Sequence, residues 1–293
     1  MDKTPQHTPD GPLQIDLQAV LRAKLGSRRM RYVPAFAVRG VENMICAHRM
    51  NRLLRQAYPR RGGDFARFIL EQLDITANFT GVENLPEKGD GRVLFVSNHP
   101  FGGVEGLAMI DFFTRRYGRF HVMVNDLLMA IDPLREVFLP VNKHGRQNED
   151  SVRRVAKAFA SDAPVLIFPA GLVSRIDGRG RLHDLTWRKT FVSLAIASHR
   201  DIVPMYVDGR NTAFFYRFAR LRERLGIKLN IEMLRLPKEV FRMCGKSFGI
   251  NIGKRIPCTE LQGGPRAAET AAAICRTVYA LAPGAPAADN LNN

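Results

Sequence analysis

The sequence predicts an α/β fold with a mostly parallel central sheet flanked by helices, preceded by an amphipathic helical region at the N-terminus. Two patterns carry this prediction. Between residues 13 and 73, apolar residues recur at the three- and four-residue spacing of a helix, with arginines between them. From Gly81 onward, short apolar runs alternate with helical patterns, and such alternation is typical of a parallel sheet covered by helices.

The chain divides into four segments. Residues 1–12 and 283–293 are polar and carry prolines, and they have too little apolar surface to offset the entropy lost on ordering, so we expect two disordered tails. Residues 13–80 form the N-terminal helical region, and residues 81–282 form the main domain. With 293 residues, of which 45% are hydrophobic, the chain can bury one substantial core.

The apolar stripe of the N-terminal region has two interpretations. Its members are Leu17, Val20, Leu21, Val38, Val41, Met44, Ile45, Phe65, Phe68, Ile69 and Leu73. The stripe could pack on the main core as a lid. Alternatively, part of it could lie on a membrane, with arginines at the lipid headgroups and apolar side chains below them.

The strands and helices expected in the main domain follow from its apolar runs and from the turn residues between them. A strand is expected at 93–97 (VLFVS) because this apolar run ends in turn residues, and the run at 164–168 (PVLIF) is similar. Further strands are expected at 120–124, 137–141, 202–207 and 248–252. Helices are expected at 104–116, 151–160, 186–199 and, in an alanine-rich segment, 265–281.

The charge of the chain favours an anionic partner. The 44 Lys and Arg residues outnumber the 28 Asp and Glu residues, giving a formal net charge of +16 at pH 7. Nucleic acid, anionic lipid and acidic carrier proteins all fit this charge. The basic residues are dispersed, however, and neither a zinc-finger spacing nor an aromatic RNA-binding motif occurs, so we expect no nucleic-acid partner.

The cysteines and histidines predict neither disulfides nor a metal site. The cysteines Cys46, Cys244, Cys258 and Cys275 are far apart, which indicates a reducing compartment. No histidine has the spacing of a metal-binding motif, so no metal is expected.

The N-terminus does not resemble a signal peptide, and no run reaches the roughly 18 apolar residues of a membrane span. A membrane partner would therefore be bound at its surface.

A histidine and a carboxylate follow the first strand of the main domain. His99 and Glu105 lie on a glycine-containing turn that opens a helix. A neutral histidine can take the proton from an attacking hydroxyl, and a carboxylate on its other nitrogen fixes the tautomer and stabilises the imidazolium. The N–H groups of Gly102 and Gly103 could approach a negative oxygen or a phosphate at the helix N-terminus. This turn is therefore the candidate catalytic site.

A second turn of small residues follows the strand at 164–168. It contains Gly171 and Ser174 and is followed by Arg175, whose guanidinium can bind a phosphate or a carboxylate. Since ligands bind where the strands of an open α/β sheet end, we expect both turns to contribute to one site.

These motifs resemble the glycerolipid acyltransferase superfamily, which includes the lysophosphatidic acid acyltransferases. The likeness is strongest to a bacterial branch labelled hemolysin or lysophospholipid acyltransferase, and it extends from about Arg31 to Pro257. The segments that carry it are NHPFGGVEG, FPAGLVSR, DLTWRKTFVSLA, IVPMYVDG and NTAFFY, in that order. The resemblance implies that His99 and Glu105 are catalytic and that Asn98 belongs to the substrate site.

The sequence departs from the superfamily pattern in three places. Five residues separate His99 from Glu105, where the superfamily has four residues and an aspartate. Ala170 stands where the third motif has glutamate. The second motif, which usually ends in a phosphate-binding arginine, corresponds only loosely to a segment that offers Lys143 or Arg146. These departures make an acceptor other than lysophosphatidic acid plausible.

The resemblance implies that residues 81–282 form an acyltransferase domain. It would move a fatty acyl chain from acyl carrier protein or coenzyme A, both donor substrates rather than cofactors, to a hydroxyl of a lysophospholipid or a lyso-amino-acid lipid. Such an enzyme would act peripherally on an anionic surface, at the cytoplasmic face of the membrane. The alternative is an inactive lipid-binding or scaffold protein of the same fold, which Glu105 and Ala170 favour.

Overall fold

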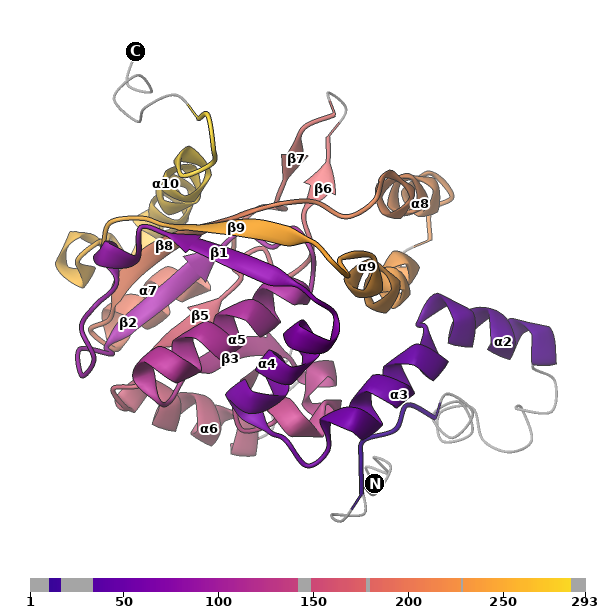
Figure 1. Cartoon of the computed structure of the whole chain (residues 1–293). Helices are drawn as coiled ribbons and strands as arrows, with labels where there is room; N and C mark the ends of the chain where they lie inside the picture. Colours follow the sequence, from indigo (N-terminus) through magenta and orange to yellow (C-terminus); the bar gives the residue numbers. More distant parts are fainter. Residues whose placement is uncertain (1–10, 17–33, 142–148, 178–179, 228, 286–293) are drawn as a thin grey trace.

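The computed structural model describes residues 11–16, 34–141, 149–177, 180–227 and 229–285 (Figure 1). Most of the two predicted tails lies outside these ranges. So do three members of the N-terminal apolar stripe, Leu17, Val20 and Leu21, and the candidate lysine Lys143.

A sheet of seven strands forms the centre of the fold. The strands are β1 (Thr76–Thr80), β2 (Val93–Ser97), β3 (His121–Asn125), β4 (Phe138–Val141), β5 (Val165–Ile167), β8 (Asp201–Asp208) and β9 (Ser247–Ile252). Their order is β1-β9-β8-β2-β5-β3-β4, and each neighbouring pair is parallel except β8 and β9. The predicted α/β fold with a mostly parallel sheet is confirmed.

Helices lie on both faces of the sheet and beyond one end of it (Figure 1). They are α2 (Ala35–Met44), α3 (Ala47–Ala57), α4 (Gly62–Gln72), α5 (Val104–Tyr117), α6 (Glu149–Ala160), α7 (Thr190–Ala197), α8 (Ala213–Arg224), α9 (Leu236–Arg242) and α10 (Ala267–Ala280). A small antiparallel hairpin, β6 (Arg175–Ile176) and β7 (Leu182–His183), lies outside the sheet. Among the described residues, no helix is both long and apolar enough to cross a membrane.

The two faces of the sheet bury separate cores. Strand β2 is buried along its whole length, and its side chains alternate between the faces. Val93 and Phe95 join a core with α4 and α5, which cover one face in Figure 1. Leu94 and Val96 join a second core with side chains of α6, α7 and α10. Because β2 is covered on both faces, it reads as a continuous apolar run in the sequence.

The sheet begins earlier in the chain than the sequence predicts. Residues 76–80, assigned above to the helical region, form β1 and pair in parallel with β9. Their exposed and half-buried side chains alternate, which is the two-residue period of an edge strand rather than a helix. The helical region therefore ends before Thr76.

The C-terminal part of the N-terminal apolar stripe packs on the main core. Phe65, Ile69 and Leu73 are 4–6% exposed and belong to the same core as the central helix α5. Helix α3 also buries Leu53 and Leu54. Of the two interpretations, packing on the core therefore describes α4, which buries most of its apolar side chains against that core.

Candidate active site

Three loops meet at one edge of the sheet. Strand β2 is parallel to both β5 and β8, so the carboxyl ends of the three strands lie at the same edge. The loop after β2 carries His99, the loop after β5 leads to Arg175 at the start of β6, and the loop after β8 leads to Asn211. This edge is where an open α/β sheet binds its ligands.

His99 and Glu105 form the pair that the sequence predicts. Nδ1 of His99 lies 3.0 Å from Oε1 of Glu105, whose side chain is fully buried. The imidazole is 18% exposed and stacks on Phe168 with the ring centroids 4.1 Å apart. Since Nδ1 faces the carboxylate, Nε2 is the nitrogen left to meet a substrate.

The Glu105 carboxylate also accepts three backbone hydrogen bonds. The donors are the N–H groups of Phe101 at 2.9 Å, Gly102 at 3.0 Å and Gly103 at 2.9 Å. Glu105 is the second residue of α5, and its long side chain folds back over the helix N-terminus. The expectation that Gly102 and Gly103 offer these N–H groups to a substrate oxygen or phosphate is therefore wrong, because Glu105 occupies that position.

The environment of Glu105 favours its ionised form. Burial opposes ionisation, but the charge and hydrogen bond of His99 and the N–H groups of Gly102 and Gly103 outweigh it and lower the pKa of Glu105. Because the pKa is lower in the folded state, ionised Glu105 stabilises the fold above its ordinary pKa. That contribution disappears as the pH falls through the lowered pKa. At neutral pH Glu105 is an anion that can hold and stabilise a charged His99.

The turn after β2 and the turn after β5 pack tightly on each other. Gly102 has a φ of +86°, and a Cβ at this position would lie 2.5 Å from a methyl group of Val173. The backbone N–H of Ser174 donates to the carbonyl oxygen of His99 at 2.9 Å. Gly102 is therefore required by this close approach, and the second turn holds the histidine backbone in place.

Asn98 connects two strands instead of facing a substrate. Its amide donates to the carbonyl oxygen of Val207 at 2.9 Å and accepts from the N–H of Val207 at 2.7 Å. The side chain is 2% exposed. Asn98 therefore fixes the end of β2 to β8 and positions His99, which is a different role from the predicted substrate contact.

Ser174 is likewise used inside the protein. It is fully buried, and its hydroxyl donates to Asp184 Oδ1 at 2.5 Å. Gly171 lies in the same turn, with a φ of +63°, and its N–H donates to the carbonyl oxygen of Phe168 at 2.9 Å. Ser174 and Gly171 therefore stabilise the conformation of the turn that supports His99.

Asp184 is a site residue that the sequence did not single out. It accepts from the backbone N–H of His99 at 3.3 Å and from the indole N–H of Trp187 at 2.9 Å, as well as from Ser174. Burial raises the pKa of its carboxyl, against hydrogen bonds from Ser174 and Trp187 that favour the anion. The only signal in the sequence was its place at the start of DLTWRKTFVSLA.

Arg175 forms an ion pair with a buried glutamate of the protein. Its Nη2 lies 2.7 Å from Oε1 of Glu232, and its Nη1 donates to the carbonyl oxygen of Val173 at 3.0 Å. Glu232 is fully buried and also pairs with Arg222 at 2.9 Å. The expected contact of Arg175 with an anionic acceptor is therefore not what the structure places there. Glu232 lies 57 residues further along the chain, so the sequence did not reveal this partner.

Two candidates from the second motif and the expected absence of a metal site remain to be considered. Lys143 and Arg146 lie outside the described residues, so the structure does not place the second motif. In the described part of the chain, no three His, Cys, Asp or Glu side chains are grouped so that they could hold a metal ion.

Known proteins resemble this chain over most of its length. A family model described as acyltransferase matches residues 19–286. Lyso-glycine lipid O-acyltransferases from Phocaeicola vulgatus and Bacteroides thetaiotaomicron are 39% and 38% identical over 275 residues, covering 94% of this chain and 97% and 100% of theirs. The crystal structure of the 1-acyl-sn-glycerophosphate acyltransferase PlsC from Thermotoga maritima matches with a TM-score of 0.44 and 12% identity, over 84% of this chain and 92% of that one. By the family model and by its curated relatives, this chain belongs to the acyltransferase family.

Proposed function

We propose that this protein transfers a fatty acyl group from a thioester to the hydroxyl of a lyso-glycine lipid, with His99 as the general base. The contact between His99 and the buried Glu105 is the observation that carries the mechanism. The acceptor is inferred from the two relatives, which are named lyso-glycine lipid O-acyltransferases and are 39% and 38% identical to this chain.

The pair supplies the proton transfers of the reaction. Nε2 of His99 takes the proton of the acceptor hydroxyl as its oxygen attacks the thioester carbonyl carbon. Glu105, which contacts Nδ1, stabilises the imidazolium that forms when Nε2 takes the proton. The tetrahedral intermediate collapses, the carbon–sulfur bond breaks, and the imidazolium gives its proton to the leaving thiolate. The acceptor oxygen is the nucleophile, so no acyl-enzyme intermediate is required.

The first test compares acceptors and donors. Purified protein, given acyl carrier protein or coenzyme A thioesters, is expected to acylate lyso-glycine lipid with a kcat/KM at least about tenfold above that for lysophosphatidic acid. The reason is that Arg175 is engaged by Glu232 and that Ala170 replaces a glutamate, so the usual phosphate contacts are altered. Thioester cleavage and product lipid would be measured together.

Two outcomes would decide against the proposal. Folded protein that acylates no lyso-lipid from either donor would favour the inactive lipid-binding alternative. A preference for lysophosphatidic acid would retain the enzyme but replace the acceptor. Comparing the two donors in the same assay also identifies the thioester that the enzyme uses.

Helix α8 provides a surface for the proposed membrane partner. The helix buries Phe215 and Ala219. On its other side, Phe214, Leu221 and Leu225 are 52%, 53% and 66% exposed, and their spacing of seven and four residues places them on one stripe. Such a stripe of large apolar side chains indicates a contact surface.

The charges along α8 match an anionic bilayer. Arg217 and Arg224 are exposed beside the apolar stripe, and neither has an ion-pair partner within the described ranges. Arg235 extends the basic rim, with its guanidinium 4.2 Å from the ring of Phe214. We therefore propose that α8 lies on the cytoplasmic face of the membrane, with its apolar stripe among the lipid chains and its arginines at the headgroups.

Vesicle binding tests this surface. Replacing Arg217 and Arg224 by alanine is expected to weaken binding to anionic vesicles about fivefold for each arginine, because a basic residue near such a surface contributes about 1 kcal/mol. The Leu221→Ser/Leu225→Ser variant should also bind less. Sedimentation with anionic and neutral vesicles at rising salt would measure both effects.

Matched controls separate the α8 surface from general charge and hydrophobicity. Lys88→Ala/Lys157→Ala removes two exposed charges elsewhere, and Val152→Ser removes an exposed apolar side chain of α6. Both controls should bind as the unaltered protein does. If the α8 variants also bind normally, another surface contacts the membrane.

A further inference from the structure

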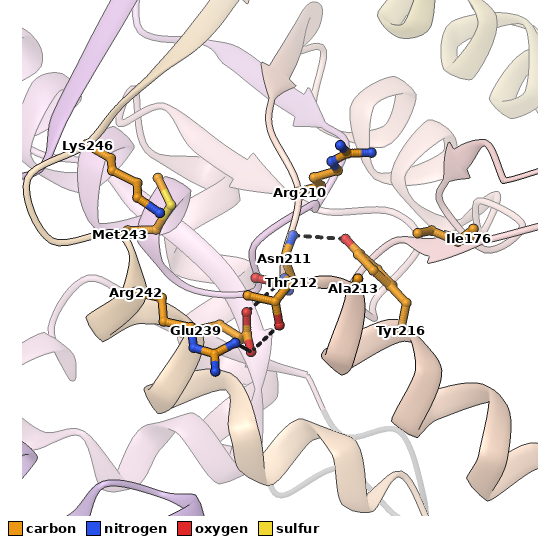
Figure 2. Close-up of a pocket in the computed structure, with 10 residues that line it drawn as sticks. All are labelled: Ile176, Arg210, Asn211, Thr212, Ala213, Tyr216, Glu239, Arg242, Met243 and Lys246. Carbon is orange, nitrogen blue, oxygen red and sulfur yellow. Dashed lines mark hydrogen bonds and ion pairs between the residues drawn. The ribbon is translucent and has the colours of Figure 1, made fainter.

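A basic pocket of about 430 Å³ lies between α8, α9 and the ends of β8 and β9 (Figure 2). Three cationic side chains line it, each from a different element. Arg210 belongs to the loop after β8, Arg242 to the end of α9, and Lys246 to the turn before β9. Tyr216, Asn211 and Thr212 supply the polar wall opposite Lys246 and Met243 in Figure 2.

The pocket carries more positive than negative charge. Its only acidic lining residue is Glu239. The Glu239 carboxylate accepts hydrogen bonds from the N–H and the hydroxyl of Thr212, both at 2.9 Å, and lies 3.6 Å from Arg242. Within the described ranges, no ion pair involves Arg210 or Lys246. Two cations thus remain to attract an anion into a space large enough for a lipid headgroup.

The pocket borders the catalytic turn. The amide of Asn211 donates to the carbonyl oxygen of Phe101 at 3.2 Å, and Phe101 is two residues after His99. The ring of Phe101 packs so closely on Gly209 that a Cβ there would lie 2.0 Å from a ring carbon. A ligand in the pocket would therefore be anchored beside the turn that carries the general base, next to the proposed membrane surface of α8.

We propose that this pocket binds the anionic head of the acceptor lipid, with Arg210 and Lys246 as its specificity-determining cations. This inference rests on the proposed function and names the part of the acceptor that is recognised. A glycine joined to an acyl chain through its nitrogen keeps a free carboxylate. A cation of the pocket can bind this carboxylate by charge-assisted hydrogen bonds, and the second cation adds to the attraction from the other side of the pocket (Figure 2). Arg175, which the sequence suggested for this task, is engaged by Glu232. A phosphate of the donor thioester has similar chemistry and is the competing source.

The test combines pocket variants with a neutral acceptor. Arg210→Ala and Lys246→Ala are each expected to raise the KM for lyso-glycine lipid about tenfold, with a smaller effect on kcat. The methyl ester of the same lipid lacks the charge and should be a poor substrate for the unaltered protein. The Arg210→Ala/Lys246→Ala variant should lose most of this discrimination between acid and ester, an effect that a general loss of folding would not produce.

Each outcome has one meaning. The Lys88→Ala/Lys157→Ala variant, which removes the same charge elsewhere, should keep the discrimination. If the pocket variant discriminates as well as the unaltered protein, the pocket assignment is overturned while the proposed function stands. A raised KM for coenzyme A thioester, but not for acyl-pantetheine, would overturn it in favour of the donor phosphates. If the unaltered protein does not acylate the lipid, the proposed function fails, and this inference fails with it.

Discussion

Replacing His99 by alanine is expected to lower acyl transfer about 10²- to 10⁴-fold, the range that a positioned general base contributes. The fold should be retained, because the imidazole is partly exposed and contacts the rest of the protein mainly through Glu105 and Phe168. Steady-state rates of thioester cleavage and product formation would be measured with the variant shown to be folded by circular dichroism. The exposed His48 of α3 is a matched control, and His48→Ala should keep full activity.

The same experiment extends to Glu105. Glu105→Gln is expected to reduce activity as well, since an amide cannot stabilise the imidazolium by charge. The loss in the double variant should be much smaller than the product of the two single losses, because the two residues act as one unit. If folded His99→Ala protein retains full transfer, His99 is not the base, and the enzyme uses another group to take the proton of the acceptor hydroxyl.

The strand ends that build the site could be predicted from the sequence because they are local features. The runs that form β2 and β5 are short, apolar and followed by small residues. The position of His99 after a strand can therefore be predicted from adjacent residues. The pairing of His99 with Glu105 was predictable for the same reason, because the two residues share one turn. Local sequence was therefore enough to predict the contact between the two side chains of the candidate catalytic pair.

The substrate contacts could not be predicted in this way, because their partners are distant in the chain. Asn98 is held by Val207, and Arg175 is held by Glu232, both of which come from other elements. A guanidinium at a strand end suits an anion from solvent and a buried glutamate equally well, and only the fold decides which it meets. The basic pocket is a similar case, since Arg210, Arg242 and Lys246 form no motif along the sequence.

The start of the sheet was misplaced for a different reason. Strand β1 is an edge strand of five residues, and its segment TANFT contains three polar residues that point away from the core. Such a strand has neither the continuous apolar run of β2 nor turn signals of its own. Its pairing with β9, which comes about 170 residues later, provides its stability.

Removing the buried charge of Glu232 is expected to lower the free energy of unfolding by about 3–5 kcal/mol, because Arg175 and Arg222 would be left without their shared carboxylate. Both guanidinium groups are close to fully buried, with 11% and 8% of their side chains exposed, so water cannot replace it. Urea denaturation of Glu232→Gln would measure the loss. Glu223→Gln, which removes an exposed carboxylate 2.9 Å from the same Arg222, is the matched control and should cost about 1 kcal/mol or less.

Arg175→Lys separates this structural role from a role in substrate binding. A lysine keeps one charge near Glu232 but loses the hydrogen bond to Val173 and the planar guanidinium. We expect the variant to be less stable while its KM for the acceptor stays close to that of the unaltered protein. A KM that rises severalfold in a protein of unchanged stability would show instead that Arg175 leaves Glu232 to bind the acceptor. The headgroup would then bind at the turn after β5 and not in the pocket.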